Sequence, residues 1–143
     1  MTPSDQAQLL LRKAAQDMAV LNKLIDDREI SDETLGYHAQ QAAEKLIKAL
    51  LALEGHPYPR SHNIGLLLDL LQSHGIPLPE RFDNVDALTP FGTVFRYDDL
   101  PLEDAPDRHS WVALIQNIFE YVELAVGRCS EGGCAVLWWF KQC

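Results

Sequence analysis

The stretch from Tyr37 to Leu53 constrains the fold most, because it predicts a helix that is apolar on two sides. The preceding Ser31-Asp32-Glu33 supplies capping oxygens and acidic charge for a helix start. Gly55 and Pro57 then favour a helix end. The main apolar face recurs at helical spacing and consists of Leu35, Ala39, Ala42, Leu46, Ala49, Leu50 and Leu53. The far side also carries apolar residues, namely Tyr37, Ile47 and Leu51. Such a helix is either central in a bundle or half of an interface.

Four further helices are predicted from capping signals and helical spacing of apolar residues. Pro3-Ser4-Asp5 starts the first, and Ser61 is expected to cap the third after a loop rich in proline. The predicted ranges are Gln6–Asp27, Ile64–Ser73, about Glu80–Leu88 and about Arg108–Val126. Because no strand-like alternation precedes the C-terminal tail, we expect an all-α fold, an up-and-down helical bundle of about five helices.

The apolar stripes of these helices predict the core. The first helix contributes Ala7, Leu10, Ala14, Met18, Leu21 and Ile25. The third contributes Leu66, Leu67, Leu70 and Leu71. The last contributes Trp111, Ile115, Ile118, Val122 and Ala125. A chain of 143 residues is long enough to bury such a core without disulfides or metal.

The charge balance limits the classes of partner. With 21 acidic and 12 basic residues the net charge is −9, so the overall field of the protein does not attract nucleic acid. No apolar run is long enough to span a membrane, which takes about 18 or more residues. The N-terminal MTPSDQAQ has neither a basic flank nor an apolar signal core, so we expect a cytoplasmic protein.

The C-terminal tail differs in composition from the rest of the chain. We expect a bundle over residues 1–127 and an apolar tail over 128–143 that contains all three cysteines, Cys129, Cys134 and Cys143. The run CAVLWWF is too short to span a bilayer and too apolar for a free solvated end, so it is expected to pack on the bundle or on a partner chain. The cysteine spacing lacks a CxxC pair and a nearby histidine, so no metal site and no cofactor are expected.

A second stripe on the central helix is the best candidate for a ligand surface. It consists of His38, Gln41, Lys45 and Lys48. Two ammonium groups and an imidazole are able to take a phosphate, and Gln41 is able to read a base or ribose. The alternative is a solvated lysine face, with Lys48 in an ordinary surface ion pair with Glu44 four residues before it.

A second group of polar residues opens the third helix. His62 and Asn63 are able to line a pocket with Arg60. The alternative is structural, because Ser61 and Asn63 are residue types that cap helices.

Several of these residues also carry a family resemblance. The segment HAQQAAEKLIKALL, the pair His62-Asn63 and the later pair Arg96-Tyr97 resemble the HEPN family over roughly Ser4 to Gly127. The family consists of small all-helical domains named for higher-eukaryote and prokaryote nucleotide binding. The resemblance implies a homodimer, and it adds Arg96 and Tyr97 to the candidate ligand-binding residues.

The ribonuclease members of that family use an arginine followed four to six residues later by a histidine. No arginine of this chain has that spacing. Arg96 stands where the resemblance places the arginine, but YDDLPLED follows it, and those carboxylates repel an RNA backbone. A salt bridge to one of them is the structural alternative for Arg96. We therefore name no catalytic residue and do not expect RNA as a partner.

The resemblance also implies a kind of partner, since HEPN proteins of this sort are commonly encoded beside a minimal nucleotidyltransferase in toxin–antitoxin-like pairs. We therefore expect a non-catalytic helical module that binds a nucleotide-bearing ligand or such a nucleotidyltransferase. One alternative is a divergent HEPN ribonuclease toxin. A second is a structural protein whose tail drives assembly or dimerisation.

Overall fold

The fold is all-α throughout the part of the chain that the structure describes. A computed structural model describes residues 1–76, 78–80, 82, 85 and 107–130. Its helices are α1 (Pro3–Leu24), α2 (Asp32–Leu53), α3 (Ile64–Ser73) and α5 (Arg108–Ser130), and these described residues contain no strand. The all-α prediction is confirmed. The helix expected near 80–88 lies largely outside the described residues.

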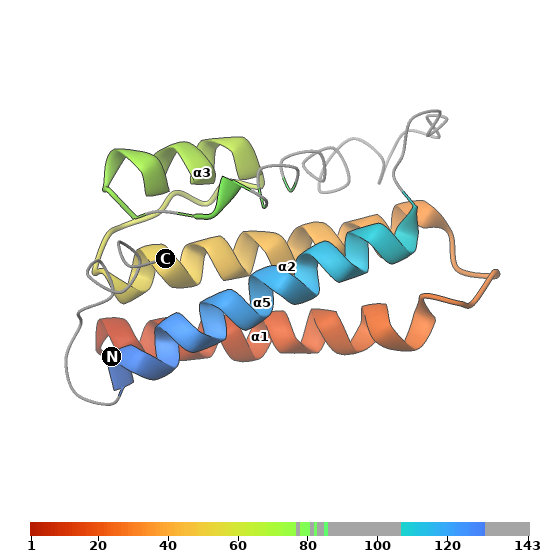
Figure 1. The fold of residues 1–143 in the computed structure, drawn as a ribbon, viewed down its shortest axis with the longest axis horizontal. Coiled ribbons are helices and arrows are strands. Elements are labelled where there is room, and N and C mark those ends of the chain that lie inside the picture. The colour runs from red at the N-terminus through yellow and green to blue at the C-terminus, as the bar shows by residue number, and fades with distance from the viewer. Residues whose placement is uncertain (77, 81, 83–84, 86–106, 131–143) are drawn as a thin grey trace.

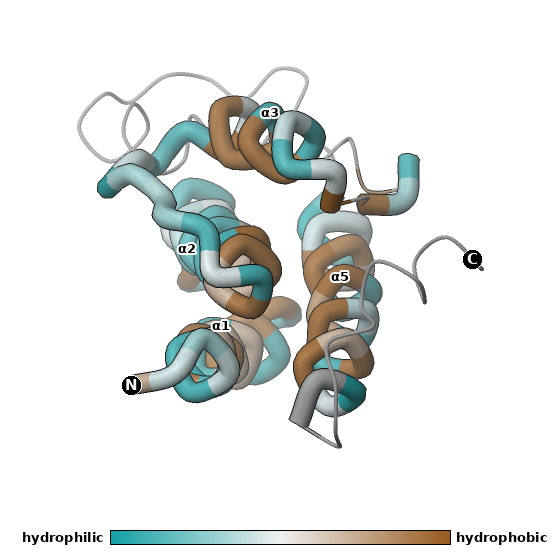
Figure 2. Tube along the Cα trace, turned by 90° about the vertical axis from the view of Figure 1, so that its left-hand side faces the viewer, coloured by the Kyte–Doolittle hydropathy of each residue, from teal (hydrophilic) through white to brown (hydrophobic). Residues whose placement is uncertain are grey.

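Helix α2 lies at the centre of the bundle. It packs against α1, α5 and α3, and α1 and α5 also contact each other. Figure 1 shows α1, α2 and α5 side by side, with α3 beside α2. Figure 2, which looks along the bundle, shows apolar faces turned toward the space between the three long helices. Every residue of the predicted main face of α2 is buried, and so are Ile47 and Leu51 on the other side. The two-sided apolar pattern therefore marks a central helix.

Capping groups define the helix starts. The Thr2 hydroxyl accepts the Asp5 N–H at 3.1 Å, and the Asp5 carboxylate accepts the Thr2 N–H at 3.1 Å, a reciprocal capping box. The Ser31 hydroxyl accepts the Thr34 N–H at 3.2 Å, so α2 begins at Asp32. At the other end Gly55 has φ +74°, the left-handed conformation that favours glycine after a helix.

Three predictions about where helices end and which residues form the core need correction. Helix α1 ends at Leu24, short of the expected Asp27. Helix α5 continues through Gly127 to Ser130 instead of ending at Val126. Leu66 is not a core residue, because it is 43% exposed, whereas its neighbours Ile64, Leu67 and Leu71 are buried. Among the described helices, α3 makes most of its contacts with α2.

Arg108 ties the first residue of α5 to the connection between α1 and α2. Its guanidinium donates to the carbonyl oxygens of Ile25 (3.1 Å), Asp27 (3.2 Å) and Ile30 (2.9 Å). It also makes two bonds, at 2.7 and 3.0 Å, to the Asp32 carboxylate at the start of α2. Arg108 therefore satisfies backbone carbonyl groups of the connection between α1 and α2. No helix within the described ranges is long and apolar enough to cross a membrane.

Candidate functional site

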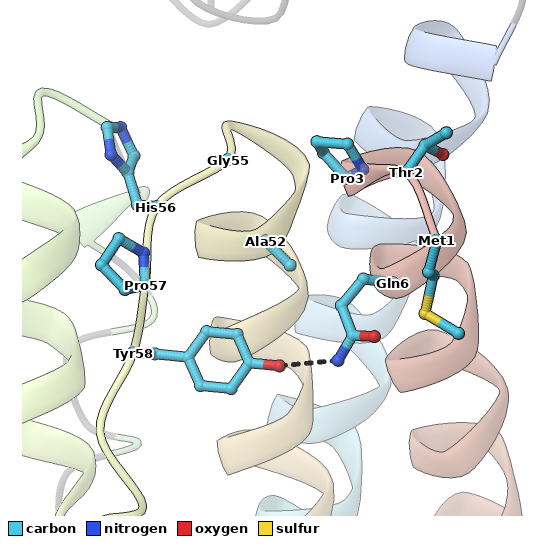
Figure 3. A pocket seen from close by; sticks show the side chains of 9 residues that line it. All are labelled: Met1, Thr2, Pro3, Gln6, Ala52, Gly55, His56, Pro57 and Tyr58. Atoms are coloured by element: carbon cyan, nitrogen blue, oxygen red, sulfur yellow. Dashed lines mark hydrogen bonds between the residues drawn. The ribbon is translucent and has the colours of Figure 1, made fainter.

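The segment between α2 and α3 runs back along α2 and is anchored to the bundle by its side chains. The hydroxyl of Tyr58 accepts a hydrogen bond from the Gln6 side-chain amide of α1 at 2.8 Å (Figure 3). The ammonium of Lys48 lies 5.7 Å from the centroid of the Tyr58 ring, within cation–π range. Tyr58 thus bridges α1 and the lysine stripe of α2, the name used from here on for His38, Gln41, Lys45 and Lys48.

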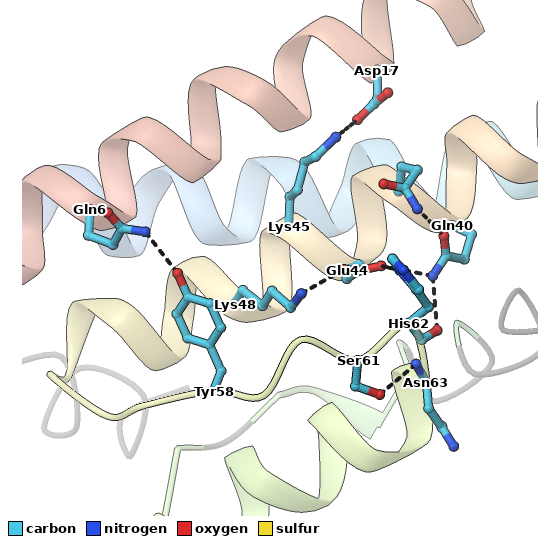
Figure 4. A network of polar contacts seen from close by, with 11 residues as sticks. Gln6, Asp17, Gln40, Glu44, Lys45, Lys48, Tyr58, Ser61, His62 and Asn63 are labelled. Atoms are coloured by element: carbon cyan, nitrogen blue, oxygen red, sulfur yellow. Dashed lines mark hydrogen bonds and ion pairs between the residues drawn. The ribbon is translucent and has the colours of Figure 1, made fainter. Parts of the chain in front are cut away.

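Glu44 is the centre of a polar network on α2 (Figure 4). Its carboxylate accepts hydrogen bonds from the Lys48 ammonium at 2.6 Å and from the Gln40 amide at 3.0 Å, and it lies 3.0 Å from Nδ1 of His62. Gln40 also donates to the backbone carbonyl of His62 at 3.0 Å. Glu44 is only 6% exposed, so these partners replace the water that an ionised carboxylate requires.

The network keeps Glu44 ionised. Burial acts to raise the pKa of its carboxyl group, but the hydrogen bonds from Lys48 and His62, the Lys48 charge and the Gln40 hydrogen bond outweigh that effect. The pKa of Glu44 is therefore lowered from its ordinary value. A buried, charged carboxylate that is bonded at both oxygens is a fixed internal counter-charge for Lys48.

A second cluster holds the other half of the stripe between α1 and α2. Asp17 of α1 accepts a hydrogen bond from the Lys45 ammonium at 2.5 Å and lies 3.2 Å from Nδ1 of His38. Gln41 donates to the side-chain oxygen of Gln40 at 2.7 Å and so joins the Glu44 network. All four residues of the predicted stripe therefore have partners from the protein itself.

The sequence left two interpretations of the lysine stripe, a ligand surface and a solvated face with a surface ion pair, and the structure tests only the ion pair. The predicted Glu44–Lys48 pair is present, but it is not a surface pair, because the side chains are 7% and 12% exposed. Ligand binding by His38, Gln41, Lys45 and Lys48 stays a prediction.

The His62-Asn63 pair separates into two roles. Asn63 is the N-cap of α3, and its side-chain oxygen accepts the Leu66 N–H at 3.1 Å. Ser61 is not the N-cap; its hydroxyl accepts the Asn63 N–H at 3.0 Å. His62 points to Glu44 and keeps about half of its side chain exposed. Arg96 and Tyr97 lie outside the described residues, so their roles stay predictions.

Sequence reasoning missed Asp17, Gln40, Tyr58 and Gln6 as members of these clusters. Gln40 had a signal, since it stands four residues before Glu44, on the same helix face. Asp17, Tyr58 and Gln6 had none, because they meet α2 only through tertiary packing. Over residues 1–76, 78–80, 82, 85 and 107–130, no group of three His, Cys, Asp or Glu side chains is placed to hold a metal ion.

Comparison with protein families agrees with this geometry. The sequence model of the HEPN domain family matches residues 7–125, which contain α2 and α3 and most of α1 and α5. Comparisons with curated proteins and with solved structures gave no match. Because the match covers well over half of the 143 residues, this chain belongs to the HEPN domain family.

Proposed function

We propose that this HEPN protein is a non-catalytic module that binds a partner protein, and that the partner is a minimal nucleotidyltransferase. The observation that carries the proposal is the internal neutralisation of the lysine stripe. Lys48 has its carboxylate at 2.6 Å and Lys45 at 2.5 Å. The stripe therefore supports the packing of α1, α2 and the α2–α3 segment, and it does not offer a pair of available ammonium groups.

A nucleotide-bearing ligand is the less favoured form of the proposal. A phosphate that approached Lys48 would also approach the Glu44 carboxylate, and like charges in one site repel. To bind, it would have to separate an ion pair that is mostly shielded from water, which is costly. Partner binding requires no such separation.

Ribonuclease activity has no support from the described residues. The guanidinium of Arg108 is used by the α1–α2 connection. His38, His62 and His109 each lie beside a carboxylate, of Asp17, Glu44 and Asp26 respectively. This arrangement accords with the lack of an arginine-to-histidine spacing in the sequence.

The family resemblance also leads us to propose a homodimer, with the outer side of α5 in the interface. Leu124 of α5 is 55% exposed, and with Met1 and Leu66 it is one of three exposed large apolar residues in the part of the chain that the structure describes. Light scattering of the wild type and of Leu124→Lys tests this part. The variant is expected to be monomeric, and an unchanged dimer would exclude this side of α5.

Two measurements test the partner proposal. In calorimetric titration, ATP and GTP at millimolar concentration are expected to give no heat of binding. In size-exclusion chromatography with light scattering, the protein is expected to form a defined complex with a minimal nucleotidyltransferase encoded beside it. Nucleotide binding that is lost in both Lys45→Met and Lys48→Met would contradict the proposal and restore the stripe as a phosphate site.

A further inference from the structure

A pocket with a mainly apolar lining opens at the end of the bundle where α1 begins and α2 ends (Figure 3). Its volume is about 380 Å³, and its wall includes Met1, Pro3, Ala52, Pro57 and Tyr58. This volume is near the lower limit of the roughly 300–1,000 Å³ of small-molecule sites, so it suits one large side chain and not a helix. No residue of the lysine stripe lines it.

The polar groups of the pocket suit an indole. The Tyr58 hydroxyl and the Gln6 side-chain amide, which are joined at 2.8 Å, lie on one wall and both carry acceptor oxygens. An indole has one N–H donor and no acceptor, and it needs a partner for that donor when it is buried. The Tyr58 ring and Pro57 supply flat apolar surface beside these acceptors.

Helix α5 delivers the C-terminal segment to this end of the bundle. Arg108, at the start of α5, bonds to the carbonyl oxygens of Ile25 and Asp27 just beyond the end of α1. The two helices contact each other and have nearly equal lengths, 22 residues in α1 and 23 in α5. The end of α5 therefore lies beside the start of α1, as Figures 1 and 2 both show.

We infer that the pocket binds a tryptophan side chain, Trp138 or Trp139, from the apolar segment that follows α5 in the same chain. In Figure 3 the pocket side chains lie in front of α1 and α2 and α5 lies behind these helices, so the segment has to pass around the start of α1 to reach the pocket. The chain from Ser130 to Trp138 covers eight residues and spans up to about 26 Å when extended. The segment CAVLWWF is the apolar run that lies within this reach.

Tryptophan fluorescence of the full chain tests the inference. In a Trp111→Phe background, Trp138→Phe or Trp139→Phe leaves one tryptophan to report. One of the two single-tryptophan chains is expected to show blue-shifted emission and weak quenching by acrylamide. Ala52→Phe, which fills the pocket, is expected to restore emission and quenching close to those of the unfolded chain. Gln6→Leu, which removes one of the two acceptors, is expected to reduce the shielding.

Gln116→Leu is the matched control, because Gln116 is also a half-buried helical glutamine but lies outside the pocket. It is expected to leave the emission unchanged. Circular dichroism checks that each variant keeps its helices. Solvent-exposed emission from both tryptophans in the folded protein would overturn the inference. So would shielding that neither Gln6→Leu nor Ala52→Phe reduces, since the segment would then pack elsewhere.

A mixing experiment distinguishes a tail that binds the pocket of its own chain from a tail that binds the pocket of a second copy. A chain with Ala52→Phe and an intact tail is mixed with a chain in which both tail tryptophans are replaced by phenylalanine. No shielding is expected in the mixture if each tail fills its own pocket. Shielding that appears on mixing would assign the pocket to the tail of a second copy and overturn the same-chain inference.

Discussion

Replacing Glu44 by glutamine should destabilise the bundle far more than its position on an amphipathic helix suggests. The carboxylate holds Lys48 on one oxygen at 2.6 Å, and it holds Gln40 and His62 on the other at 3.0 Å each. A glutamine keeps one acceptor oxygen and turns an NH₂ group toward the remaining donors. The favoured arrangement leaves the oxygen on Lys48, because that ammonium is only 12% exposed, whereas His62 is able to turn to water.

The expected cost is about 2–4 kcal/mol of unfolding free energy. A hydrogen bond to a charged group contributes roughly 1.5–3 kcal/mol, and the half-exposed His62 contributes least. This loss of unfolding free energy is near or below the roughly 3–5 kcal/mol typical of breaking a fully buried ion pair, because an acceptor for Lys48 remains. For a domain of this size the melting temperature should fall by roughly 6–12 °C.

Urea unfolding followed by circular dichroism measures this cost, and Asp17→Asn is the matched control. Asp17 also pairs with a lysine and a histidine, but Lys45 is 25% exposed and can turn to water, so that variant should lose about 1 kcal/mol. In the double variant Glu44→Gln/Lys48→Met the two losses should not add, because the second change removes the ammonium that the first deprived of its counter-charge. A loss in Glu44→Gln no larger than in Asp17→Asn would refute a buried network centred on Glu44.

Three further predictions follow from individual contacts. Because the pKa of Glu44 is lowered on folding, its stabilising contribution is complete above the unfolded value of about 4.5 and is lost as the pH falls through the lower folded value. Thermal unfolding between pH 7 and pH 3 should therefore show a smaller acid loss in Glu44→Gln than in the wild type, and equal losses would contradict this assignment. Arg108→Met should cost about 2–4 kcal/mol, since it removes five hydrogen bonds, whereas Met at the exposed Arg12 should cost less than about 0.5 kcal/mol. Asn63→Ala should cost about 1 kcal/mol and Asn63→Gly only a few tenths, because glycine is tolerated at an N-cap; equal losses would show that Asn63 does not act as a cap.

The sequence alone determined the helices and the place of α2. Helical spacing of apolar residues on two sides of one segment requires burial on both sides, and a single domain satisfies that requirement by putting the segment in the middle. Capping residues and glycines are local signals, so most helix ends were predicted to within a few residues. HAQQAAEKLIKALL, the longest of the three motifs that carry the family resemblance, lies within one helix.

Only the tertiary structure decided what the polar residues do. The spacing of Glu44 and Lys48 is that of an ordinary surface ion pair, one of the two interpretations of the stripe, yet the segment carrying Tyr58 and His62 covers them. Asp17 and Lys45 are 28 residues apart, and Arg108 and Asp32 are 76 apart, so no local pattern predicts either pair. Periodicity reports which side of a helix is apolar, but the charge that a lysine meets depends on which neighbouring segment packs over it.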